Sequence, residues 1–376
     1  MKKLLLLALL PLTAMATPIK GINETYQDWN LVCDNTGTCR MAGYQSAAMD
    51  CATIVGVKMA CQVSEEQSEK LNNPVSILFT RKAGDKESVS AQLKLTPIVK
   101  AGKEVPIGKI SVIRLNGESL DAVINYKDKP SVLNETQTLA LLNALKQSSK
   151  IEVFSGENQW LLSDKGAAAA MLKMDEFQQR LNKPSALMRK GENKAASLRP
   201  QPVPKIQAVK IPNRKTYSIE RGSAKFDKVM ALLRQSNGTN ENSESYCSAL
   251  YEDKSWWTDN IEIYPLTHGK VLAESICWAG PSGDIIHYYA VMDENLTRVE
   301  QVLANQYNQA EYDKASHILT VSGSFRRGVA DCFDGGTAVW NGKIFIRTSE
   351  WTTGLCKGFM GGAWELPTFV SEVVAK

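Results

Sequence analysis

The chain has 376 residues, of which 43% are apolar and 22% are charged, and this composition excludes a disordered or collagen-like protein. Its 44 lysines and arginines nearly balance its 40 aspartates and glutamates. A formal charge of +4 gives no electrostatic basis for binding nucleic acid. At about 100–200 residues per domain, the length predicts two domains, each large enough to bury a core.

The first residues have the features of a secretory signal peptide. A basic start precedes an apolar run at residues 4–12, and an A-x-A cleavage motif ends at Ala16. The run is too short to span a bilayer, and no later stretch reaches the about 18 consecutive apolar residues of a membrane span. We therefore expect residues 1–16 to be removed and the mature chain to be a soluble, periplasmic protein.

All eight cysteines lie after this segment, four early and four late, and an even number predicts disulfides in an exported protein. Each set of four permits three pairings. Cys33 and Cys39 form the most favourable pair, because they flank a turn-rich segment between two strand-like runs. The pairs that we favour are Cys33–Cys39, Cys51–Cys61, Cys247–Cys277 and Cys332–Cys356. Without a C-x-x-C motif, and with no metal-ligand spacing among the histidines, we expect no metal and no cofactor.

A proline-rich segment divides the chain near residue 200. Four prolines fall within residues 200–212, and residues 191–213 contain no aromatic side chain, which is typical of a semi-extended linker or a surface strap. We therefore predict a signal peptide, an N-terminal α+β domain, a linker and an aromatic-rich C-terminal α+β domain. Their residues are 1–16, 17–192, 193–212 and 213–376.

In the N-terminal part, alternation between apolar and polar residues predicts strands, and Asn116-Gly117 predicts a type I′ turn between two of them. Asn134 and Gln137 predict a capping box at the start of one helix. Apolar residues with a period near 3.6 predict a second helix over residues 166–181. The predicted strands cover residues 29–34, 75–80, 89–95, 110–115, 118–124, 151–154 and 159–162.

The C-terminal part is predicted to open with a helix that Ser223 caps and Gly238 ends. Most of the aromatic residues follow residue 213, which suits an antiparallel sheet with an aromatic core. The predicted strands cover residues 261–266, 270–278, 285–292, 317–323, 337–340 and 343–348, the last two joined by an Asn-Gly hairpin. The fold class is therefore α+β, with two domains that each contain a mainly antiparallel sheet and one or two packed helices.

Three separated segments carry distinctive motifs. They are D-W-x-L-x-C-D-N from residue 28; the alanine-rich stretch from residue 166, with M-D-E-F-Q-Q-R and A-L-M-R-K-G after it; and R-G-V-A-D-C from residue 327, with W-N-G-K-I-F and C-K-G after it. Their order and spacing resemble the family of exported bacterial proteins of unknown function numbered 1176. The first half is more loosely similar to the invasion-associated locus B proteins.

This resemblance implies export and a two-part chain, and it implies no chemical activity. The chain departs from the family pattern at Ala330, Phe333 and Asn341, where glycine, glycine and aspartate are expected.

The motifs of common enzyme classes are missing: the chain has no Walker A loop, G-x-G-x-x-G, H-E-x-x-H, G-x-S-x-G or S-x-x-K. We expect His268 in a hairpin turn and His317 at the start of a strand. Ser282, Asp284 and His287 lie too close together in sequence to favour a Ser-His-Asp site. We therefore assign no catalytic residue, and the sequence favours a protein that is not an enzyme.

Asp175 and Glu176 are adjacent carboxylates in the second predicted helix. Neighbouring side chains on a helix point about 100° apart, so this pair cannot flank one glycosidic bond. Glu176 can pair with Arg180 at i+4. We interpret this group as a structural clamp between the helix and the strands.

Four residues remain as candidate contacts for a ligand or partner. Trp256 and Trp257 lie among carboxylates and amides, which is typical of a glycan-stacking platform or a protein hot spot. Asp331 and Asp334 belong to a predicted turn over residues 331–336, whose spacing fits no known calcium loop. We expect non-catalytic binding of an envelope protein or glycan. A hydrolase of cell-wall glycan or peptide, and a structural envelope protein, are the alternatives.

Overall fold

The computed structural model describes residues 19–46, 73–100, 103–127, 129–238, 247–251, 260–279, 285–303, 309–324 and 330–375. The predicted signal peptide, the predicted Cys51–Cys61 disulfide, and Trp256 with Trp257 lie outside these residues. Within them, antiparallel sheets predominate and three α-helices are present, so the fold is α+β and mostly β. No helix in this part of the chain is long and apolar enough to cross a membrane.

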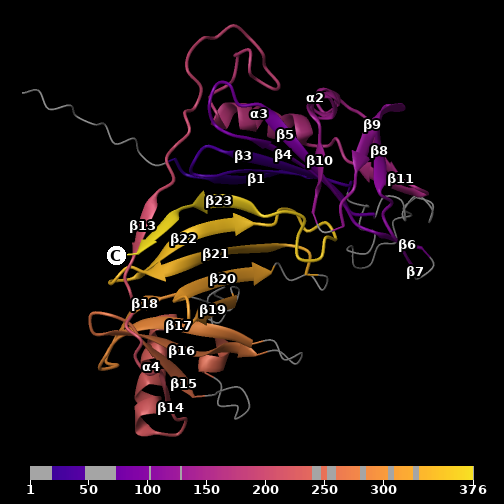
Figure 1. Ribbon diagram of the computed structural model, residues 1–376. Helices are drawn as coiled ribbons and strands as arrows, with labels where there is room; N and C mark the ends of the chain where they lie inside the picture. The colour runs from indigo at the N-terminus through magenta and orange to yellow at the C-terminus, as the bar shows by residue number, and fades with distance from the viewer. Residues whose placement is uncertain are drawn as a thin grey trace, which may run out of the picture.

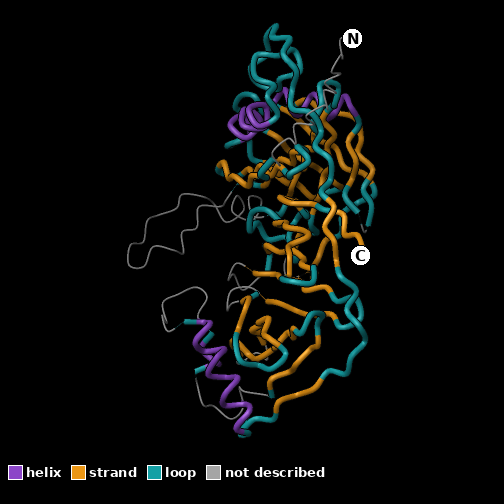
Figure 2. The backbone as a smooth tube through the Cα atoms, turned by 90° about the vertical axis from the view of Figure 1, so that its left-hand side faces the viewer, coloured by secondary structure: helices purple, strands orange, loops and turns teal. Residues whose placement is uncertain are grey.

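The sheets lie one above another in Figure 1, with helices at the two ends of the stack. Figure 2 shows the same arrangement from the side: strands fill the length of the molecule between the helices near its upper end and α4 near its lower end. Each internal sheet can therefore have an apolar layer on both of its faces.

The uppermost large sheet is six-stranded and antiparallel, in the order β1-β2-β3-β4-β5-β10. Its strands are β1 (Ile22–Tyr26), β2 (Trp29–Cys33), β3 (Cys39–Tyr44), β4 (Val75–Arg81), β5 (Val89–Leu95) and β10 (Ser131–Leu133). Alternation along β2 sends Trp29 and Leu31 to one face and Val32 to the other, and all three are buried. Both faces of this sheet are therefore apolar and need a cover.

Helix α3 (Ala167–Phe177) covers the first face, where Met171 and Met174 are buried. The helix ends before the predicted residue 181, because Gln179 has a left-handed φ of 54°. The predicted capping box begins α2 (Glu135–Ala144). A four-stranded sheet adjoins these helices, in the order β12 (Asn158–Leu162), β11 (Ile151–Ser155), β8 (Ile110–Leu115) and β9 (Glu118–Ile124), with a small hairpin of β6 (Ile98–Lys100) and β7 (Lys103–Val105).

The proline-rich segment forms a strap that includes β13 (Lys205–Ala208), which pairs in parallel with β24 (Glu372–Ala375). Two five-stranded antiparallel sheets follow it. The first contains β14 (Tyr217–Ile219), β15 (Ile261–Pro265), β16 (Lys270–Ala279), β17 (Ile285–Asp293) and β18 (Val299–Val302). The second contains β19 (Gln309–Asp313), β20 (Ile318–Ser324), β21 (Phe333–Trp340), β22 (Phe345–Thr352) and β23 (Leu366–Val370).

Helix α4 (Ala224–Asn237) and the short 3₁₀ helix η1 (Ser248–Leu250) cover one face of the β14–β18 sheet. The predicted cap is present, since the Phe226 amide donates to Ser223 Oγ at 3.1 Å. Between the two five-stranded sheets lies a core rich in aromatic residues, as the composition of this part predicts. It includes Tyr264, Tyr289, Tyr312, Trp340 and Phe345.

The second face of the six-stranded sheet is covered by the C-terminal segment between β22 and β23. Phe359 and Trp364 of this segment pack with Val32, Tyr44 and Leu78 in one buried cluster. The cluster joins residues from both sides of the proline-rich strap. The two parts therefore share this core, and the predicted domain boundaries at residues 192 and 213 stay predictions.

Polar contacts fix the C-terminal segment on the sheet at several points. Lys357 Nζ lies 2.7 Å from Asp28 Oδ1, and Trp364 Nε1 donates to Ser76 Oγ at 2.7 Å. Lys94 Nζ donates to the Ala363 carbonyl at 2.8 Å. These bonds satisfy buried polar groups, so they specify where the segment lies as well as holding it there.

A buried ion pair joins α3 to the six-stranded sheet. Arg81 Nη2 lies 2.8 Å from Asp175 Oδ1, and the two side chains are 1% and 0% exposed. Asp175 Oδ2 accepts the amides of Leu187 and Met188 at 2.8 and 2.9 Å. The clamp interpreted from the sequence is therefore present, with Arg81 as its basic partner.

The predicted Glu176–Arg180 pair is wrong. Glu176 lies 3.4 Å from Lys173, three residues earlier on the exposed side of α3. Arg180 follows the left-handed turn after the helix, so its side chain turns inward and donates to the Gly84 carbonyl.

We expect Asp175→Asn to lower the free energy of unfolding by about 3–5 kcal/mol, since it leaves the buried Arg81 guanidinium without its counter-charge. Glu176→Gln, on the exposed side of the same helix, is the matched control and should change it by less than about 0.5 kcal/mol. Urea unfolding followed by circular dichroism measures both. Equal effects of the two variants would contradict the clamp.

We expect Trp364→Ala to lower the free energy of unfolding by about 3–5 kcal/mol, the cost of truncating a large buried aromatic side chain. Met360→Ala serves as the control, because Met360 lies in the same segment and is 89% exposed. Equal free energies of unfolding for Trp364→Ala and the wild type would contradict this packing and would show that the C-terminal segment is only loosely attached.

Candidate functional site

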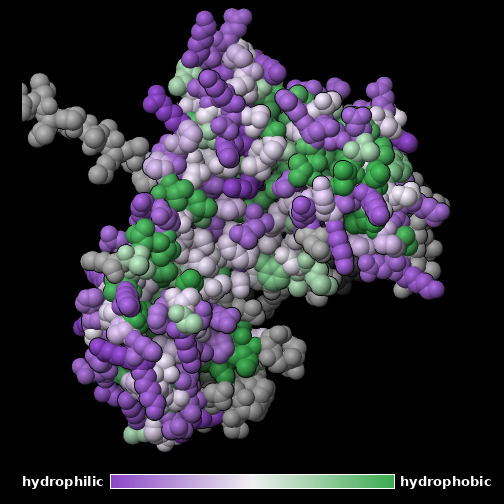
Figure 3. Space-filling view, in the orientation of Figure 1, coloured by the Kyte–Doolittle hydropathy of each residue, from purple (hydrophilic) through white to green (hydrophobic). Residues whose placement is uncertain are grey.

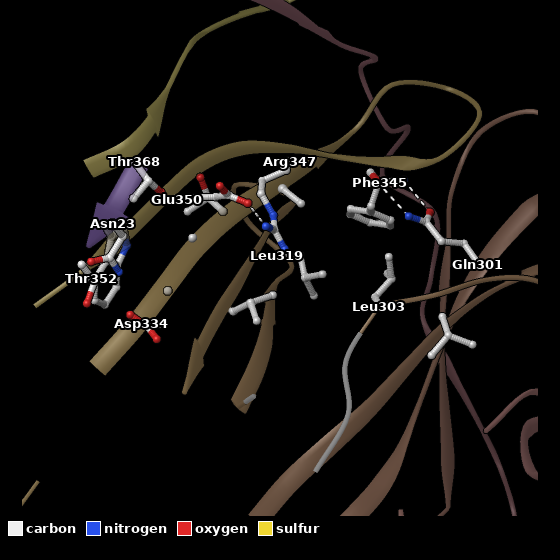
Figure 4. Close-up of a pocket in the computed structure, with 17 residues that line it drawn as sticks. Asn23, Gln301, Leu303, Leu319, Asp334, Phe345, Arg347, Glu350, Thr352 and Thr368 are labelled. Carbon is white, nitrogen blue, oxygen red and sulfur yellow. Dashed lines mark hydrogen bonds and ion pairs between the residues drawn. The ribbon is translucent and has the colours of Figure 1, made fainter. Parts of the chain in front are cut away.

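A groove of about 520 Å³ lies on the β19–β23 sheet, bounded by β18 on one side. Figure 4 shows that its two ends differ in chemistry. Leu303, Leu319 and Phe345 line one end, and Asn23, Asp334, Thr352 and Thr368 line the other. The groove can therefore hold an extended ligand that has both apolar and polar groups.

Residues from both halves of the chain build this groove. Asn23 comes from β1 of the six-stranded sheet, whereas Thr368 comes from β23. At the far end, Gln301 of β18 donates to the Phe345 carbonyl at 2.9 Å and accepts the Phe345 amide at 2.8 Å. This pair of bonds closes the apolar end, because it attaches β18 to β22.

Two glycines allow the strands under the groove to approach closely. A Cβ on Gly335 would lie 2.3 Å from the ring of Trp351, its cross-strand partner. A Cβ on Gly336 would lie 2.2 Å from the Ser349 carbonyl oxygen. The floor of the groove is therefore bare backbone at these two positions, with the Trp351 ring lying against Gly335.

Three charged side chains line the groove. Arg347 and Glu350 form an ion pair on β22. The carboxylate of Asp334 on β21 has no hydrogen-bond or ion-pair partner among the residues that the structure describes. Asp334 and Glu350 lie on the same face of the sheet, because Asp334 pairs with Thr352 and Gly336 pairs with Glu350. The Asp334 carboxylate is therefore available to accept hydrogen bonds from a ligand.

The predicted turn over residues 331–336 is wrong, because β21 begins at Phe333 and continues through both glycines. The first residues of β21 include two adjacent glycines, so the sequence pattern predicts no strand there. Pairing with β20 and β22 stabilises the strand instead. The two aspartates of this segment consequently have different surroundings. Asp334 lines the groove, whereas Asp331 is 1% exposed and accepts the Gly358 amide at 2.6 Å through Oδ2.

Asp331, Cys332 and Cys356 are the one group of three potential metal ligands close together in the described part of the chain. Cys332 and Cys356 are bonded to each other, so their sulfurs are not thiolates that could bind a metal ion. Asp331 instead fixes the loop that carries Gly358.

Three of the four predicted disulfides occur in the described residues: Cys33–Cys39, Cys247–Cys277 and Cys332–Cys356. These bonds are consistent with an oxidising location outside the cytoplasm. Among the histidines, His268 lies in the turn before β16, as predicted. His317 precedes β20, and its Nδ1 lies 2.9 Å from the Tyr312 hydroxyl.

Apolar side chains also gather at the upper right of Figure 3, over α2 and the β8–β9 hairpin. Ile110, Ile124, Val132 and Leu139 are each more than half exposed. Leu139 lies on the exposed side of α2. We assign no site to this patch.

We expect Gly336→Ala to destabilise the protein more than Gly335→Ala. The clash at residue 336 is with backbone, which cannot move without breaking the β21–β22 pairing, whereas the Trp351 ring can shift. Overpacking of this kind costs about 1–3 kcal/mol. Urea unfolding should also show that Trp351→Leu restores stability to Gly335→Ala and not to Gly336→Ala. A larger loss of stability in Gly335→Ala than in Gly336→Ala would contradict this geometry.

A comparison with protein families matches residues 23–371 to a model described as "Protein of unknown function (DUF1176)". No curated protein and no solved structure matches the chain. The looser likeness to invasion-associated locus B proteins is not tested by these comparisons. The match spans the six-stranded sheet, the strap and the groove, and it confirms the resemblance carried by the three sequence segments. The chain therefore belongs to the DUF1176 family.

Proposed function

We propose that this protein is a periplasmic, non-catalytic binding protein that holds a component of the cell envelope in the β19–β23 groove. The observation that carries the proposal is the Asp334 carboxylate, which no described residue bonds, in a groove of about 520 Å³. A carboxylate that accepts hydrogen bonds favours a ligand rich in N–H and O–H groups, and the apolar end favours methyl groups on the same ligand. Fragments of the cell wall, which combine sugars with short peptides, have both.

The groove is open and polar at one end, which suits a segment of a longer chain rather than a small, enclosed molecule. The Arg347–Glu350 ion pair lines the groove together with the Asp334 carboxylate, so the groove presents both signs of charge. This arrangement can recognise a ligand that itself carries an ammonium group and a carboxylate, as peptides do. Trp256 and Trp257 remain predicted contacts from the sequence, outside the described residues.

We expect Asp334→Asn to weaken the binding of muramidase-solubilised cell-wall fragments by about tenfold, since a hydrogen bond to a charged group contributes about 1.5–3 kcal/mol. Isothermal titration calorimetry measures this. Glu118→Gln is the control, because it removes one exposed negative charge from β9, a strand that does not line the groove. Equal affinities of wild type and Asp334→Asn would overturn the proposal.

A second candidate function is hydrolysis of cell-wall glycan, which one specific observation favours. Asp334 and Glu350 are diagonal neighbours on one face of two paired strands, and diagonal side chains lie about 7–8 Å apart. Two carboxylates at such a distance can act as acid and base in an inverting glycosidase.

Release of reducing ends from purified peptidoglycan distinguishes the two functions. Binding without catalysis gives no release above that of a heat-denatured sample. A hydrolase gives release that both Asp334→Asn and Glu350→Gln abolish while the cell-wall fragments still bind.

A further inference from the structure

A second pocket, of about 430 Å³, lies between β15–β17 and the β19–β20 hairpin. Strand β20 contributes to both hollows: Leu319 and Val321 line the groove, whereas Thr320 and Ser322 line the pocket. The two hollows have no lining residue in common. The pocket is therefore separate from the site of the proposed function.

Glu274 of β16 organises the wall of this pocket. Its Oε1 lies 2.8 Å from His287 Nδ1, and its Oε2 accepts the Tyr264 hydroxyl at 2.5 Å. The Tyr289 hydroxyl also donates to it. Burial raises the pKa of Glu274, but these donors more than offset burial, so its pKa is lowered and the carboxylate is ionised.

The Glu274 carboxylate fixes which nitrogen of His287 carries the proton. An ionised carboxylate only accepts hydrogen bonds, so Nδ1 must be the donor and Nε2 of the neutral ring is an acceptor. No described residue bonds Nε2, and the His287 side chain is 35% exposed on the pocket wall. The neutral tautomer of the ring therefore presents to the pocket an oriented acceptor that no described residue bonds.

The rest of the lining indicates the class of ligand. Glu311 adds a second carboxylate, and Thr320 and Ser322 add hydroxyls, whereas the three tyrosines of the lining are buried and belong to the aromatic core. Neither lysine nor arginine lines the pocket in the described part of the chain, so an anionic ligand would meet uncompensated negative charge. Carboxylates accept hydrogen bonds and hydroxyls both donate and accept them, and these are the contacts that the hydroxyl groups of a sugar make.

We propose that this pocket binds one neutral saccharide unit, and that Nε2 of His287 accepts a hydrogen bond from a sugar hydroxyl. Its volume of about 430 Å³ lies in the lower part of the range of small-ligand sites. Glu274 is a positioning residue here: it acts on the ligand through the orientation and tautomer of His287.

Nitrogen-15 labelling of histidine tests the proposal on the intact chain, because the sequence contains three histidines. Long-range ¹H–¹⁵N correlation spectra of full-length protein should show a shift of His287 Nε2 when millimolar chitobiose or maltose is added. The signals of His268, in its exposed turn, should not move. No shift of His287 with either sugar, or an equal shift with glucuronate or spermidine, would overturn the proposal.

Two variants separate recognition from folding. His287→Phe keeps the size of the ring but removes Nε2, and we expect about tenfold weaker binding of the sugar that binds the wild type. Glu274→Gln should shift the His287 signals toward a mixture of tautomers and weaken binding as well, whereas His268→Gln should change neither. Unchanged affinity in His287→Phe would overturn the proposal. Asp334→Asn should leave this sugar site intact, so failure here and failure of the groove proposal are distinguishable.

Discussion

The structure depends on one constraint: the six-stranded sheet is apolar on both faces, and the described residues that cover those faces come from different parts of the chain. Helix α3 buries Met171 and Met174 on the first face. The second face, with Val32, Tyr44 and Leu78, packs against Phe359 and Trp364, which return to it from the far end of the chain. Removing that segment from the sheet would expose a large apolar surface to water, so the two halves are coupled.

This coupling also positions the candidate site. Where β1 begins, a Cβ on Gly21 would lie 2.1 Å from the Thr368 carbonyl oxygen, so the backbones of the two halves are in direct contact. Asn23 and Thr368 consequently meet at the polar end of the groove, beside Asp334. Neither half alone contains the complete lining. The segment that covers the sheet continues directly into β23, which contributes Thr368 to the groove.

Local signals predicted much of the fold. Asn116-Gly117 adopts the two positive φ angles of a type I′ turn, and the caps at Asn134 and Ser223 form as expected. Contacts between distant residues could not be predicted. The Asp175 partner is Arg81, 94 residues away, and β21 forms across two glycines because of its neighbours rather than its own propensity. Asp334 is a contact predicted from the sequence, and it stays a prediction. The sequence did not single out Glu350 or Glu274 as lining residues, since only the strand pairing shows which side chains share a face.

Hydrogen–deuterium exchange of the full-length protein, with and without muramidase-solubilised cell-wall fragments, tests most directly whether the groove between the two halves is the binding site. We expect slower exchange in peptides from β21 and β22 together with β1, since a ligand in the groove contacts both halves, and unchanged exchange in α2 and β8–β9. Protection confined to one half, or protection over the exposed apolar patch alone, would contradict a site that the packing of the C-terminal segment creates.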